Sequence, residues 1–397
     1  MKWILLSILL VFTFLAGQAQ EKQGIDFQDI SWKEVRQKAS RENKYVFLYA
    51  YTKSCRFCRQ MEKETFPKPE VIDYYNSGFV SYKINIEDGA GGQALSEQYG
   101  IVGFPTYMYF DNAGKRVHQS SGMKPADGFI MDGKNAHNPE TALFTLKEKY
   151  DGGDRSAAFL YNYSTALDFY ADASNPQEKV AGEYLATQSA SELESEKNLR
   201  FIFTKYLAYQ SPTTQYFLQN HEKFTTIFSA DEVESRAVGI LTQTANRAGG
   251  AKDTILLKDV KNMITREFEG NARFSLLTDI HFYGGRRDWI QYARATKKYS
   301  DELAGNDWRT LHDTAVYLKH FAKEKEALVI GIQLMEKVIM TERSYENLFL
   351  LAQLQRKTGK NTLALNSAKE AVKVASQSGD DSGEATEFIA EVGGVAK

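Results

Sequence analysis

Hydrophobic and polar positions alternate with two different periods along this chain. Up to residue 150, continuous apolar runs and strictly alternating segments, which are typical of strands, come between amphipathic helical segments. Beyond the polar stretch Asp151-Gly152-Gly153-Asp154, nearly every segment has helical spacing, and short polar turns join them. The pattern predicts an α/β domain over residues 20–150, a linker, and an all-α domain of helical hairpins over residues 151–397.

The α/β part shows the order βαβαββ behind an opening helix. Tyr45–Tyr51 is a continuous apolar run, as expected of a buried central strand. The other predicted elements are helices at 31–41, 59–64, 71–75 and 93–99, a strand at 80–86, a hairpin at 105–118 and a closing helix at 139–150.

The all-α part carries several helix-start signals and one repeat signal. Asn175, Ser191 and Asp231 are each followed three residues later by Glu, which predicts helix starts there. Near the end of the chain, seven small and large apolar positions resemble a tetratricopeptide-type helix pair: Leu348, Leu351, Ala352, Gly359, Ala364, Ala368 and Ala371. Ser376 stands where such a repeat ends in proline, so a generic helical array is the alternative.

The first residues have the pattern of an export signal. Lys2 is followed by an apolar run to Ala16 and by small residues before Gln20, which predicts a signal peptide at residues 1–19. The alternative, a membrane anchor, fits less well because the run is shorter than the ~20 residues of a span. We therefore expect a protein without membrane insertion, located in the periplasm or secreted.

The charge balance narrows the range of partners. Forty-nine basic and fifty-one acidic side chains give a net charge of −2. A nucleic-acid or membrane-surface role favours a basic surplus, so neither partner is expected.

Candidate chemistry is concentrated in the two cysteines of the chain, Cys55 and Cys58, which form a CxxC pair where a strand ends and a helix begins. A ring this small removes little entropy from the unfolded chain, so a structural staple is a poor explanation. A helix start, together with Lys53, Arg56 and Arg59, would stabilise a thiolate at Cys55. The spacing predicts Cys55 as the exposed nucleophile and Cys58 as the shielded resolving cysteine.

Two other interpretations of the pair remain open. A CxxC is half of a zinc site, but no second CxxC exists and the six histidines lack the spacing of a zinc finger, so no metal is expected. The pair could also be inert in a degenerate domain. No Gly-rich phosphate loop follows a strand, and no cofactor is expected.

Residues from about Ile25 to Tyr150 resemble the thioredoxin fold. The resemblance rests on the apolar strand, the CxxC at a helix start, and Val102-Gly103-Phe104-Pro105-Thr106 before the next strand. It implies that Pro105 is a cis-proline facing the cysteines and that substrates contact the loop of Phe104, Pro105 and Thr106.

Within that fold, the residues from Cys55 to Val71 are most similar to the C-terminal domain of the DsbD family of transmembrane disulfide reductases. Ser54 and Tyr49 depart from the thioredoxin pattern, since they replace its tryptophan and its buried aspartate. Glu62 matches an acid near the cysteines of the DsbD-like domain, and we expect it to relay the proton of Cys58. A solvated helix glutamate is the alternative.

The sequence thus predicts a periplasmic thiol-disulfide oxidoreductase that reduces or isomerises disulfides of exported proteins. Its partners would be protein thiol and disulfide clients and an unidentified electron donor, with the helical part selecting the client. The alternative is a periplasmic binding or scaffold protein whose redox domain is vestigial. The direction of electron flow, the clients and the oligomeric state stay open at this level.

Overall fold

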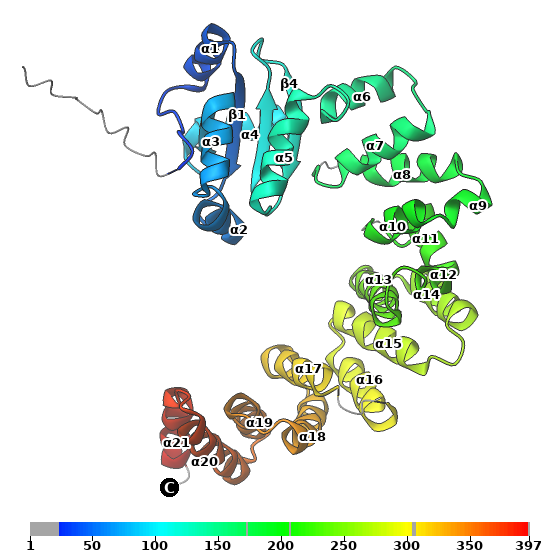
Figure 1. Cartoon of the computed structure of the whole chain (residues 1–397). Coiled ribbons are helices and arrows are strands. Elements are labelled where there is room, and N and C mark those ends of the chain that lie inside the picture. Colours follow the sequence, from blue (N-terminus) through cyan, green and yellow to red (C-terminus); the bar gives the residue numbers. More distant parts are fainter. Residues whose placement is uncertain (1–23, 172–173, 206–207, 304–306, 396–397) are drawn as a thin grey trace, which may run out of the picture. The chain divides into compact units, whose positions relative to one another are not determined.

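The computed structural model describes residues 24–171, 174–205, 208–303 and 307–395. The predicted signal peptide, residues 1–19, lies outside the described residues. Two compact units divide the chain, one up to Ser191 and one from Glu192 onward, and each is described by itself (Figure 1). The expected boundary at residue 151 therefore has helices of the first unit on both sides.

A mixed four-stranded sheet of order β2-β1-β3-β4 forms the centre of the first unit in the described residues. The central strand β1 (Tyr45–Tyr51) is parallel to β2 (Phe79–Asn85) and antiparallel to β3 (Thr106–Phe110). Strand β4 (Arg116–Ser121) pairs antiparallel with β3 and forms the other edge. The run Tyr45–Tyr51 is apolar throughout because both faces of β1 are buried.

Helices cover both faces of this sheet. On one face, Val46, Leu48 and Ala50 pack with residues of α1 (Trp32–Glu42) and Tyr99 of α4 (Gly89–Tyr99). On the other face, an aromatic cluster includes Phe47 and Tyr49. The elements that cover this cluster are α2 (Arg56–Gln60), the π-helical turn η1 (Met61–Thr65), α3 (Pro69–Gly78) and α5 (Ala126–His137). The predicted α/β thioredoxin-like fold is confirmed.

Two helical predictions in this unit need correction. Helix α5 was missed, and the closing helix α6 (Leu143–Asp151) begins later than residue 139. The sequence of α5 hides its helical period because Asp132 and Gly133 occupy buried positions where apolar side chains are expected. Gly133 is required there, since a Cβ would lie 2.5 Å from a ring carbon of Tyr74.

Helices α7 (Ala157–Leu167) and α8 (Pro176–Ala186) complete the first unit, and α6 packs against both β4 and α7. The short helix α9 (Ala190–Leu193) crosses the boundary. Ser191 lies inside α9, so the predicted helix start there is wrong; Ser195 caps the next helix instead. Asn175 directly precedes α8, as predicted.

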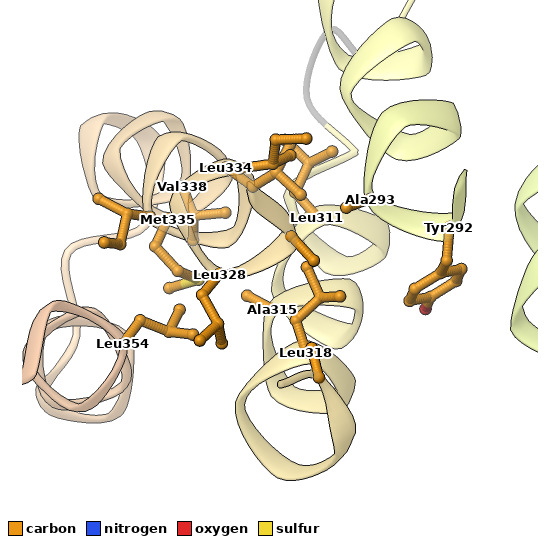
Figure 2. Packing of buried hydrophobic residues seen from close by; sticks show 14 of the residues in the cluster. Tyr292, Ala293, Leu311, Ala315, Leu318, Leu328, Leu334, Met335, Val338 and Leu354 are labelled. Atoms are coloured by element: carbon orange, nitrogen blue, oxygen red, sulfur yellow. The ribbon is translucent and has the colours of Figure 1, made fainter. Parts of the chain in front are cut away.

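The second unit is all-α in its described residues. Its helices are α10 (Glu196–Thr204), α11 (Pro212–Gln219), α12 (His221–Phe224), α13 (Ala230–Ala251), α14 (Thr254–Glu267), α15 (Ala272–Arg286), α16 (Trp289–Glu302), α17 (Trp308–Phe321), α18 (Lys325–Thr341), α19 (Tyr345–Lys357), α20 (Asn361–Ser378) and α21 (Gly383–Val395). Leucines of α17 and α18 form much of one core cluster, including Leu311, Leu318 and Leu328 (Figure 2). The cap of α13 is Ser229 with Glu232, so the start predicted at Asp231 is two residues late.

The C-terminal helices α19 and α20 form a packed pair joined by Gly359, whose φ of 81° suits glycine. The predicted apolar positions Leu348, Ala364 and Ala368 are buried between neighbouring helices. The helical-hairpin layout is therefore present, while its assignment as a tetratricopeptide repeat stays a prediction. In the described residues, no helix is long and apolar enough to cross a membrane.

Candidate active site

Cys55 and Cys58 lie directly after the central strand, at the start of α2. Their sulfur atoms are joined in a disulfide, with the Cα atoms 5.3 Å apart. Cys55 is the N-cap residue, and its Sγ accepts a hydrogen bond from the Cys58 N–H at 3.0 Å. Cys55 is half-buried, whereas Cys58 is only 1% exposed. The first sulfur is therefore the one that a partner can reach.

The loop of Phe104, Pro105 and Thr106 leads directly into β3, which begins at Thr106. The peptide bond between Phe104 and Pro105 is cis, as the resemblance implied. The Thr106 hydroxyl donates to the Gly103 carbonyl at 2.7 Å, and the Pro105 carbonyl accepts from the Gly122 N–H at 3.0 Å. Phe104 and Cys55 both pack against the aromatic cluster that includes Cys58. The cysteine pair and the loop residue Phe104 thus share one aromatic core cluster, while the substrate contact of the loop stays a prediction.

Acidic residues beside the cysteines were missed by the sequence analysis. Lys53 Nζ lies 3.1 Å from a carboxylate oxygen of Asp88, and this hydrogen bond raises the pKa of Lys53 and lowers the pKa of Asp88. Glu87 accepts from the Lys53 N–H at 3.1 Å and lies 3.5 Å from the Ser54 hydroxyl. The positive charge expected around Cys55 is therefore partly compensated.

Tyr49 fills the space under the CxxC helix where the thioredoxin pattern has its aspartate. Its side chain is fully buried, and its hydroxyl donates to the Cys58 carbonyl at 3.4 Å. Burial, followed by the nearby carboxylate of Glu62, raises the pKa of Tyr49 far above its usual value. Tyr49 therefore stays protonated and remains a hydrogen-bond donor.

Glu62 lies in the π-helical turn that directly follows α2, and the residue is exposed. Burial, followed by the nearby carboxylate of Glu62, raises the pKa of Tyr51 as well as that of Tyr49. The Tyr49 hydroxyl is thus close both to Glu62 and to the backbone carbonyl of Cys58, a contact that the sequence analysis did not include. The role of Glu62 as a proton relay stays a prediction.

A second group near the substrate loop was also missed. Lys124, three residues after the end of β4, is 4% exposed, and its Nζ lies 3.3 Å from Asp132 and 3.9 Å from the ring centre of Phe169. Burial lowers the pKa of Lys124. The Phe169 carbonyl, just after α7, accepts from the N–H of Ser121 at 2.7 Å. The first helical hairpin therefore contacts the sheet edge next to the cis-proline loop.

Comparison with known proteins agrees with this geometry. Residues 32–131 match the family model described as a thioredoxin-like domain, so this part of the chain is a thioredoxin-like domain with a CxxC pair. Two curated proteins named thiol:disulfide interchange protein DsbD are similar to it. The protein from Pseudoalteromonas atlantica is 34% identical over 100 residues, and the protein from Photorhabdus laumondii is 29% identical over 104 residues.

These similarities concern a limited part of each protein. The two matches cover 24% and 25% of this chain, and 17% and 18% of the respective relatives. Among solved structures, the oxidised C-terminal domain of Neisseria meningitidis DsbD is 25% identical, with a TM-score of 0.26. That match covers 28% of this chain and 99% of the solved domain. The family model ends at residue 131, so the helical part lies outside it.

Proposed function

We propose that the chain is a thiol-disulfide oxidoreductase that reduces or isomerises disulfides of exported proteins. The observation that carries this proposal is the arrangement of Cys55 and Cys58 at a helix start, with one sulfur accessible and the other buried. The match of residues 32–131 to the thioredoxin-like domain, and the similarity to DsbD proteins over about 100 residues, support the same chemistry.

The reaction follows from the positions of the two sulfurs. In the reduced chain, the Cys55 thiolate attacks a client disulfide, so a Cys55–client bond forms and one client thiolate leaves. Cys58 then attacks Cys55 Sγ, which releases the second client thiolate and forms the Cys55–Cys58 disulfide. The client gains two electrons and this chain loses two. The free N–H groups at the start of α2 stabilise the attacking thiolate.

Deprotonation of Cys58 is the step that needs a positioned acceptor, because this thiol is buried. We assign that task to Glu62, with Tyr49 as a positioning residue whose hydroxyl donates to the Cys58 backbone carbonyl and lies near the carboxylate. The exposed carboxylate can pass the proton to solvent.

Turnover requires an external dithiol that reduces the Cys55–Cys58 disulfide again. The donor is not identified; we propose that clients contact the loop of Phe104, Pro105 and Thr106, which leads into β3. Export by residues 1–19 would place the reaction in the periplasm or outside the cell, and the helical part would select the client.

An insulin-reduction assay with a dithiol donor tests the proposal. We expect turnover with the full chain and loss of turnover in both Cys55→Ser and Cys58→Ser. A binding or scaffold protein with a vestigial redox domain would show no cysteine-dependent turnover, and this result would refute the proposal.

A further inference from the structure

A second site lies in the helical unit, where α13, α15, α16 and α17 surround a cavity of about 320 Å³. Its lining residues are Asn246, Ile280, His281, Gly284, Trp289, Tyr292, Thr310, Asp313, Thr314 and Tyr317. The cavity includes part of the unusual Gly284–Trp289 segment, in which Arg287 ends α15 in the left-handed region and Asp288 caps α16.

Glycines allow the cavity to form between closely packed helices. A Cβ on Gly285 would lie 2.0 Å from the Asn246 carbonyl oxygen, so α13 and α15 are in direct backbone contact there. A Cβ on Gly284 would lie 3.3 Å from the ring of Tyr292. The absent side chain at Gly284 leaves the Tyr292 ring as part of the cavity wall.

The walls are rich in aromatic rings. Tyr292 belongs to the same buried cluster as the leucines of α17 and α18, and Figure 2 shows it at the edge of that cluster. Its hydroxyl accepts from Thr314 at 3.3 Å, which fixes the ring. Tyr317 is 6.4 Å from Tyr292 between ring centres and is 50% exposed, while Trp289 lies 5.8 Å from Tyr292. Three rings therefore surround one opening.

The charge of the lining is negative. Asp313 is at the rim, with its side chain 71% exposed and one oxygen 3.1 Å from Nδ1 of His312. No lysine or arginine is among the described residues that line the cavity. Partial desolvation lowers the pKa of His281, although its side chain reaches the surface, so this ring is neutral at pH 7.

We propose that this cavity binds an organic cation. In this proposal the rings of Trp289, Tyr292 and Tyr317 contact the cation, and the carboxylate of Asp313 balances its charge. Aromatic rings attract cations through the negative charge of their faces, and the attraction grows when water is excluded. The Asn246 side chain donates to the His281 carbonyl at 3.3 Å, which leaves its amide oxygen as an acceptor for an N–H group. The cation could come from an arginine or lysine of a bound polypeptide or from a free ammonium compound.

Calorimetric titration of the full oxidised chain distinguishes these sources. The probes are a blocked Gly-Arg-Gly peptide, the same peptide with uncharged citrulline, and tetramethylammonium. We expect the arginine peptide to bind more tightly than the citrulline peptide. Tighter binding of the arginine peptide than of tetramethylammonium indicates a polypeptide source, whereas equal or tighter binding of tetramethylammonium indicates a small ammonium compound.

Two surface variants locate the binding. Tyr317→Leu and Asp313→Asn should each weaken the affinity for the cation by about 3- to 30-fold. Glu302→Gln removes an exposed carboxylate that does not line the cavity and should leave the affinity unchanged. Absence of cation binding, equal affinity for the citrulline peptide, or unchanged affinity in both variants would overturn the proposal. The disulfide takes no part in this titration, so the result is independent of the proposed redox function.

Discussion

At the scale of single residues, we propose that Glu62, positioned by Tyr49, takes the proton of the buried Cys58 thiol. Tyr49 stays protonated and donates to Cys58, so it cannot replace the aspartate of the thioredoxin pattern as an acceptor. Glu62 is the carboxylate that contacts Tyr49. The proton path would therefore begin in the core and end at an exposed side chain.

Removing this carboxylate should slow the attack by Cys58. With thionitrobenzoate bound to Cys55, Glu62→Gln should release the chromophore about 10-fold more slowly near pH 7, because a positioned base contributes at least that much. The difference should shrink at alkaline pH, where Cys58 ionises without a base. The control is Glu64→Gln, because Glu64 is another exposed glutamate of the same π-helical turn. Equal release rates for wild type and Glu62→Gln across the pH range would contradict the assignment.

The hydroxyls of two tyrosines in β3 should have opposite effects on stability. The Tyr107 hydroxyl is buried without a hydrogen-bond partner in the described residues, whereas the Tyr109 hydroxyl lies 2.8 Å from that of Tyr75. Urea unfolding should show Tyr107→Phe raising the free energy of unfolding by about 1 kcal/mol and Tyr109→Phe lowering it by about 1 kcal/mol. A loss of stability in Tyr107→Phe would indicate a partner for its hydroxyl.

Burial also makes this core sensitive to alkaline pH. Desolvation raises the pKa of Tyr107 and Tyr109 well above their usual value, so the folded chain keeps protons that the unfolded chain loses above pH ~10. Stability is therefore full below pH ~10 and falls by about 1.4 kcal/mol per pH unit for each tyrosine as the pH rises further. Tyr107→Phe should reduce the slope of the free energy of unfolding against pH, measured by urea titrations at pH 10 to 11. An unchanged slope would show that the Tyr107 hydroxyl does not cause the loss of stability.

At the scale of elements, the hydrophobic pattern predicted those strands and helices that the local sequence determines. The central strand and the helix start at Cys55 were found because an apolar run and a helix-forming sequence meet there. The position of Glu87 and Asp88 near the cysteines was not predicted, because these acids lie far from the cysteines in sequence. They come close only through the parallel register of β1 and β2, which sets Tyr51 beside Asn85.

The crossing of α13 and α15 depends on glycines, which a hydrophobic pattern does not reveal. A Cβ on Gly249 would lie 2.0 Å from the Phe282 carbonyl oxygen, whereas one on Gly239 of the same helix would meet nothing within 4 Å. Gly249→Ala should lower the free energy of unfolding of the helical unit by about 2 kcal/mol or more. Gly239→Ala should raise it by up to about 1 kcal/mol. Similar effects in both variants, measured by circular dichroism during urea unfolding, would refute the close contact.

At the scale of the whole molecule, we propose that redox chemistry and client selection belong to different units. Helices α7 and α8 group with the sheet, and Phe169 contacts Ser121, so the redox unit extends to Ser191. Residues 20–191 alone should reduce a small disulfide as fast as the full chain but should lose preference among protein clients. Equal rates on every protein client would show that the helical unit has no role in selection.

We propose that Cys55 and Cys58 exchange disulfides with protein clients. The full-length Cys58→Ser variant, exported in cells, tests this exchange by non-reducing electrophoresis and mass spectrometry. We predict client proteins bound to Cys55 through disulfides that a reductant releases, and none in the Cys55→Ser, Cys58→Ser double variant. Equal recovery of proteins with both variants, or none with either, would contradict the account.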